Sequence, residues 1–130
     1  MRSMNGVGVD SYQLGCGLEE IKEKIKDLDF TEEELDNHFT LSTDSIKFWI
    51  DKDQSNVTQI SVFGEYTGKF LKKIGIGGTL SDLNDLGIKW VKEDYVYKLP
   101  EYPGVCFELE DIDDWNEIEA PIQFISIYCE

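Results

Sequence analysis

Hydrophobic and polar residues alternate with a period of two along several stretches of the chain, and this pattern predicts strands. In 46–51 every second residue is apolar, and 105–109 repeats the alternation. The segments 59–63 and 124–128 carry large apolar residues on both faces. One face of the predicted sheet should therefore be core, and the other partly aromatic.

Two further stretches show the spacing of amphipathic helices. The first has one apolar stripe, with charged residues on the other side: Leu18, Ile21, Ile25 and Leu28. In the second, Thr79 and Asp82 form the pattern of a capping box, and Gly87 can end the helix. The sequence TEEEL at 31–35 is interpreted as a capped helical turn in solvent.

The sequence also resembles itself. LGCGLEEI at 14–21 aligns with IGGTLSDL at 76–83 at an offset of 62, and the predicted strands align at offsets of 59 and 65. We interpret the chain as a single domain, 1–130, built from two internal repeats of about 6–64 and 65–130. The expected class is α+β: two tandem strand-helix-strands units form a mainly antiparallel sheet, with two helices packed on one face.

Charge narrows the classes of partner. The 130 residues include 27 acidic and 12 basic ones, for a net charge of −15. Nucleic acids and anionic lipid surfaces are disfavoured, because both need a basic face, whereas a cationic protein is favoured. Three cysteines without a close pair, and no apolar run long enough to span a bilayer, indicate a soluble cytoplasmic protein.

The residues offer little for catalysis. His38 is the only histidine, and no nucleophile lies near it in a recognisable turn. IGIGG at 74–78 lacks the lysine of a phosphate-binding loop, so a tight turn explains its glycines better. The acidic run at 108–119 lacks the spacing of a calcium loop. We expect no enzymatic activity, no cofactor and no dedicated metal site.

Trp115 lies in the middle of that acidic run, where it has two possible roles. It would either fold back on the sheet or anchor an interface, with surrounding carboxylates selecting a basic partner. Trp49 and Tyr128, on the less buried face, raise the same question. The candidate partner-binding residues are Asp111, Asp113, Asp114, Trp115, Glu117, Trp49 and Tyr128.

In size, acidity and exposed aromatic residues the chain resembles immunity proteins of bacterial toxin systems, including contact-dependent growth inhibition. The Gly-x-x-Leu-x-acidic-aliphatic pattern at Gly15–Ile21 and Gly77–Leu83 is also similar to the tandem units of β-lactamase inhibitor proteins. These resemblances imply a one-to-one complex with a basic toxin, such as a nuclease, whose active or substrate-binding surface is occluded. A small-molecule-binding domain and a structural homodimer are the alternatives.

Overall fold

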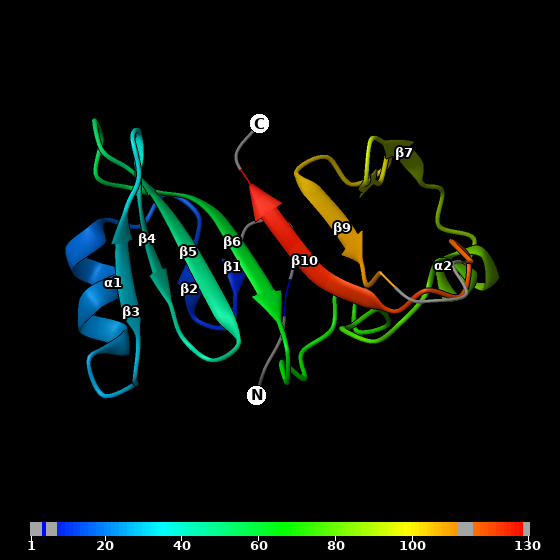
Figure 1. Cartoon of the computed structure of the whole chain (residues 1–130), viewed down its shortest axis with the longest axis horizontal. Coiled ribbons are helices and arrows are strands. Elements are labelled where there is room, and N and C mark those ends of the chain that lie inside the picture. The colour runs from blue at the N-terminus through cyan, green and yellow to red at the C-terminus, as the bar shows by residue number, and fades with distance from the viewer. Residues whose placement is uncertain (1–3, 5–7, 112–115, 129–130) are drawn as a thin grey trace.

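The computed structural model describes residue 4 and residues 8–111 and 116–128 of the chain (Figure 1). These residues form ten strands and two short helices. Their order along the chain is β1 (Gly8–Val9), β2 (Tyr12–Gln13), α1 (Leu18–Ile25), β3 (Thr31–Glu34), β4 (His38–Ser42), β5 (Ile46–Asp51), β6 (Val57–Phe63), α2 (Leu80–Asp85), β7 (Val91–Glu93), β8 (Val96–Lys98), β9 (Val105–Leu109) and β10 (Ile122–Tyr128).

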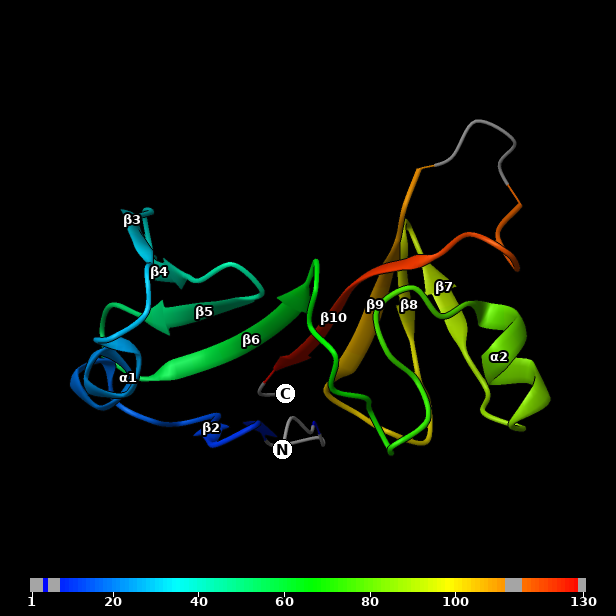
Figure 2. The ribbon, with the colours of Figure 1, turned by 90° about the horizontal axis from the view of Figure 1, so that it is seen from below.

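One antiparallel sheet of eight strands dominates the structure, in the order β3-β4-β5-β6-β10-β9-β8-β7. The order is symmetric, because each half of the chain supplies four strands and β6 pairs with β10 at the centre. In that central pair Ser61 lies opposite Ser126. Figure 2 shows that the sheet is curved, with β3 and β4 rising at one end and β7 to β9 at the other.

The segments that enter the two helices have the same backbone geometry. Gly15 and Gly77 both have φ of +88°, a conformation that favours glycine. The amide of Gly15 donates to the Val57 carbonyl at 2.8 Å, and that of Gly77 donates to the Ile122 carbonyl at 2.9 Å. Each glycine thus ties a helix entrance to the first residue of β6 or β10, so aligned residues occupy equivalent positions in the two halves.

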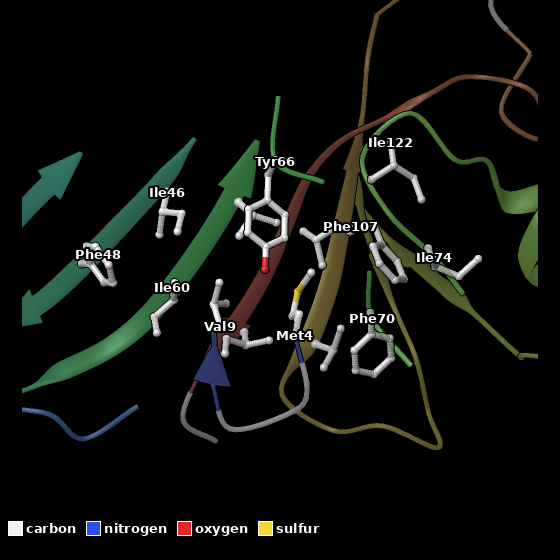
Figure 3. Close-up of a cluster of buried hydrophobic side chains, with 14 of the residues drawn as sticks. Met4, Val9, Ile46, Phe48, Ile60, Tyr66, Phe70, Ile74, Phe107 and Ile122 are labelled. Atoms are coloured by element: carbon white, nitrogen blue, oxygen red, sulfur yellow. The ribbon is translucent and has the colours of Figure 1, made fainter. Parts of the chain in front are cut away.

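The hydrophobic core lies on one face of the sheet (Figure 3). Phe48 from β5 and Phe107 from β9 are fully buried there, and burial of such a ring stabilises the fold by about 1.5 to 3 kcal/mol. α1, the β1–β2 hairpin and the segment 66–74 cover this face and contribute buried residues to the same cluster: Ile21, Ile25, Val9, Tyr66, Phe70 and Ile74.

The expected α+β class is wrong: the protein is mostly β. The helices contain only 8 and 6 residues, too few to form a layer over eight strands. α1 ends near Ile25, and Leu28, predicted on its apolar stripe, is 49% exposed. The stretch 31–34 is not a helical turn but strand β3, because its backbone pairs with β4 from Thr31 to Glu34.

Two local predictions for the second helix are confirmed, and one for a neighbouring segment is wrong. Thr79 and Asp82 form a reciprocal capping box at the start of α2, and Gly87 follows the helix with φ of +73°. The three lysines at 69, 72 and 73 predict an edge-like strand. Instead, Lys72 and Lys73 lie in the turn between the bridge residues Phe70 and Ile74, and Lys69 directly precedes Phe70 outside any strand. The edges of the large sheet are β3 and β7.

Candidate functional site

The two faces of the large sheet have different surroundings (Figure 2). α1 and the β1–β2 hairpin lie beneath β5 and β6, whereas on the opposite side the described residues place no helix, and only the curved end of the sheet itself, β3 and β4, rises there. We call this second side the uncovered face. Because side chains alternate along a strand, the register decides which residues belong to it. Aromatic residues lie near its centre.

Four half-buried aromatic residues of the uncovered face form what we call the aromatic patch: Trp49, Phe63, Phe124 and Tyr128. Trp49 lies opposite Gln59, which lies opposite Tyr128 on the next strand. Two strand spacings therefore separate the two residues, about 10 Å. Phe63 and Phe124 pair directly, with ring centroids 5.8 Å apart.

Two serines lie between these aromatic pairs. The hydroxyl oxygens of Ser61 and Ser126 are 2.8 Å apart and share a hydrogen bond. Both residues are buried although they belong to the uncovered face, because the larger side chains of the aromatic patch flank them along the two strands. Each serine hydroxyl thus has a hydrogen-bond partner in the other. The centre of the aromatic patch is therefore formed by two small side chains, with the larger rings on either side of them.

One ring of the patch already holds a cation from its own strand. The Lys47 ammonium lies 4.4 Å from the centroid of the Trp49 ring, a distance at which the ring quadrupole attracts a cation. The indole nitrogen of Trp49 is buried and has no hydrogen-bond partner among the described residues. The nitrogen-bearing edge of the Trp49 indole is therefore buried, and Lys47 covers one face of the ring.

Carboxylates surround the aromatic patch. Glu33 lies in the same row as Trp49, two strands away through Thr40, and Glu108 lies directly opposite Phe124. Glu65 and Glu110 line a pocket at the end of the patch. All four are exposed, and none forms an ion pair within the part of the chain that the structure describes. Their charges are available to an external cation.

The candidate residues from the sequence separate into three groups. Trp49 and Tyr128 lie together on the uncovered face. Asp113, Asp114 and Trp115 lie outside the described residues. Asp111 is exposed and lines a pocket with Lys92 and Tyr95. Glu117 is paired with residues of this chain, Tyr97 and Lys92.

Glu117 is held by two neighbours on the second half of the sheet. The Tyr97 hydroxyl donates to Glu117 Oε2 at 2.7 Å, and the Lys92 ammonium lies 2.9 Å from the same oxygen. The hydrogen bond from Tyr97, followed by that from Lys92, lowers the pKa of Glu117. We call these three residues the Glu117 clasp. Because Lys92 compensates its charge, Glu117 attracts an external cation less than the unpaired carboxylates do.

Phe63, Phe124, Glu65 and Glu110 are members of the site that sequence reasoning did not nominate. Alternation did place both phenylalanines on the less buried face of their strands. Nothing in the sequence indicates that Glu65 and Glu110, 45 positions apart in the chain, line one pocket. That proximity depends on how β6 and β10 pair.

The described residues form no metal-binding cluster, and the Cys106 thiol is half-buried. No group of three or more His, Cys, Asp or Glu residues within 8–111 and 116–128 is arranged to hold a metal ion. Burial raises the pKa of the Cys106 thiol to about 11, so this cysteine is protonated near neutral pH and is a poor nucleophile.

Neither described helix is long and apolar enough to cross a membrane. Comparison of this chain with protein-family models, curated proteins and solved structures found no match.

Proposed function

We propose that this protein is a bacterial immunity protein that binds a basic toxin in the cytoplasm and inhibits it by covering its active or substrate-binding surface. The observation that carries the proposal is the aromatic patch on the uncovered face, surrounded by carboxylates that form no ion pair with any described residue. Large aromatic side chains are preferred anchors of protein interfaces. A sheet face over which the described residues place no helix offers such anchors to a partner.

Charge supports a basic partner over a second copy of the same chain. A net charge of −15 attracts a cationic protein over long range and raises the rate of encounter. The same charge on two copies repels, which disfavours a homodimer through this face. A toxin that acts on nucleic acid needs a basic substrate-binding surface, and such a surface complements this protein.

The mechanism would be stoichiometric occlusion. Rings of the aromatic patch would fill pockets of the toxin, while Glu33 and Glu108, on either side of the patch, would pair with basic residues that otherwise bind substrate. Such a mechanism requires no chemistry from the inhibitor. It predicts a one-to-one complex whose association rate falls steeply with salt.

Co-expression tests the proposal directly. The protein would be produced with the toxic C-terminal domain of a large protein encoded beside it, and growth and co-purification would be scored. We expect growth rescue and a one-to-one complex. If the toxin domain is active and neither occurs, the proposal fails for that pair. A doubling of mass by the protein alone, without a partner, would favour the homodimer instead.

A matched pair of substitutions tests whether the uncovered face makes the contact. Tyr128→Ala alters the aromatic patch, whereas Tyr95→Ala removes the same ring from the β7–β8 turn, where it is 81% exposed. We expect only Tyr128→Ala to weaken the complex. Gln59→Arg is a second variant, which places a positive charge between Trp49 and Tyr128. Thermal unfolding of each variant shows whether it is folded, and equal affinity of folded variants and wild type would exclude this face.

A further inference from the structure

A pocket of about 510 Å³ lies where β6 ends and β10 begins, at the edge of the aromatic patch. Phe63 and Phe124 line it on the side of the uncovered face, and Glu65 and Glu110 supply carboxylates. Gly64 and Gly77 also line it and have no side chain to fill it. In Figure 1 this place is the lower end of the β6 and β10 arrows. Its volume is within the range of pockets that hold small ligands or single side chains.

The two rings of this pocket pack against each other, and its two carboxylates have no side-chain partner among the described residues. Within the described residues, Glu65 and Glu110 form no side-chain hydrogen bond or ion pair, and no cation lies over Phe63 or Phe124. Trp49 differs, because Lys47 already lies over its ring. A cation from outside would therefore meet less competition in the pocket than at Trp49.

We propose that this pocket binds an arginine side chain of the partner protein. A guanidinium group is planar, stacks on aromatic rings and donates hydrogen bonds in a fork that matches carboxylates. The pocket combines both requirements, since rings lie on one side and carboxylates in the same lining. A lysine ammonium would gain the charge attraction but not the stacking, and an anion would be repelled by both carboxylates.

This inference rests on the proposed function only for the identity of the protein that carries the arginine. The pocket itself can be tested with a small probe, N-acetyl-arginine-N-methylamide, added to the isolated full chain and followed by the backbone amide resonances. We expect saturable shifts confined to residues near Gly64, Gly77 and Phe124, with millimolar affinity. The lysine analogue should bind several-fold more weakly, and the neutral citrulline analogue should give no saturable shift.

Two double variants distinguish binding in the pocket from a general attraction of the arginine probe to the acidic surface. Glu65→Gln with Glu110→Gln should weaken arginine binding at least tenfold. Glu19→Gln with Glu101→Gln removes the same charge from exposed sites elsewhere and should leave binding within twofold of wild type. The amide spectrum of each variant reports whether it is folded.

Three outcomes would overturn the proposal that the pocket binds arginine. They are an absence of saturable shifts, shifts that map to another surface, and equal weakening by both double variants. Equal binding of the lysine analogue would overturn its selectivity for arginine. A pocket that fails while the toxin complex forms leaves the proposed function standing. Conversely, the chain could bind the probe in this pocket and yet rescue growth from no toxin. That result would contradict the proposed function but not the proposal about the pocket.

Discussion

The two halves of the molecule share an order of elements but differ in what they display. Each half contains a helix followed by four antiparallel strands, and β6 and β10 meet at the centre of one sheet. Phe48 on β5 and Phe107 on β9 are equivalent core positions, and both are fully buried. On the uncovered face, however, the positions of Lys47 and Trp49 in the first half correspond to Cys106 and Glu108 in the second.

The matching phenylalanines and the differing residues of the uncovered face show that packing restricts core positions more than positions on that face. A core residue must fit against many neighbours, so equivalent positions in the two halves keep apolar residues of similar size. Half-buried and exposed positions of the uncovered face are packed less tightly, so their residues can differ between the halves, whereas the buried position of Ser61 and Ser126 carries serine in both. The resulting face is asymmetric, although the order of the strands beneath it is symmetric. Common ancestry of the two halves remains a prediction.

The largest expected effect comes from equivalent core positions. Phe48→Ala and Phe107→Ala should each lower the free energy of unfolding by about 3 to 5 kcal/mol, because each removes a fully buried ring and leaves a cavity. Urea unfolding, followed by tryptophan fluorescence and by circular dichroism, measures both. Each variant should retain a single transition. Separate transitions for the two halves would contradict one continuous core.

A smaller effect is expected at the helix entrances. Gly15→Ala and Gly77→Ala place a side chain at φ of +88°, which should cost about 1 to 3 kcal/mol in each half. Gly17→Ala is the comparison, because its φ of −74° carries no left-handed strain. Gly17 is also the N-cap of α1, where alanine is disfavoured, so we expect a loss that is measurable but smaller than at Gly15 or Gly77. Chemical denaturation of all three compares them. If only one half responded, the matching glycine geometry would not matter equally in the two halves.

The helix N-termini distinguish the halves by a still smaller amount. Thr79→Ala removes the capping box of α2 and should cost about 1 kcal/mol. α1 starts at Gly17 without a side-chain cap, so Gly17→Ser should add a few tenths of a kcal/mol. The added side chain has room, since a Cβ there would lie 3.9 Å from the nearest carbonyl oxygen. Thermal unfolding detects the opposite signs, and equal signs would contradict the difference in capping.

The smallest effect concerns the Glu117 clasp, which has no counterpart among the described residues of the first half. The pKa of Glu117 is lowered in the folded protein. The clasp therefore stabilises the fold at pH values above the pKa of a free glutamate, about 4.3. That contribution should disappear as the pH falls through the lower, folded pKa. The difference in urea midpoint between wild type and Glu117→Gln should therefore be present at pH 6 and shrink toward pH 3. A difference independent of pH would show that the charge of Glu117 is not its source.

Much of the local structure was predictable because it depends on near neighbours. The alternation in 46–51 and 105–109 predicted β5 and β9, and the Thr79 and Asp82 pattern predicted the start of α2. TEEEL at 31–35 was misinterpreted, since three successive glutamates carry no period-two signal. It became a strand because β4 offers a partner for its backbone hydrogen bonds.

By itself, the sequence determined the net charge, the alternation that separates core from uncovered face, and the glycines at the helix entrances. These are properties of composition and of residues close in the chain. Only the tertiary structure decided which residues meet across strands: Trp49 in one row with Tyr128, Phe63 against Phe124, and Glu65 beside Glu110 at one pocket. The reason is physical, because strand register and sheet order depend on pairing between distant segments.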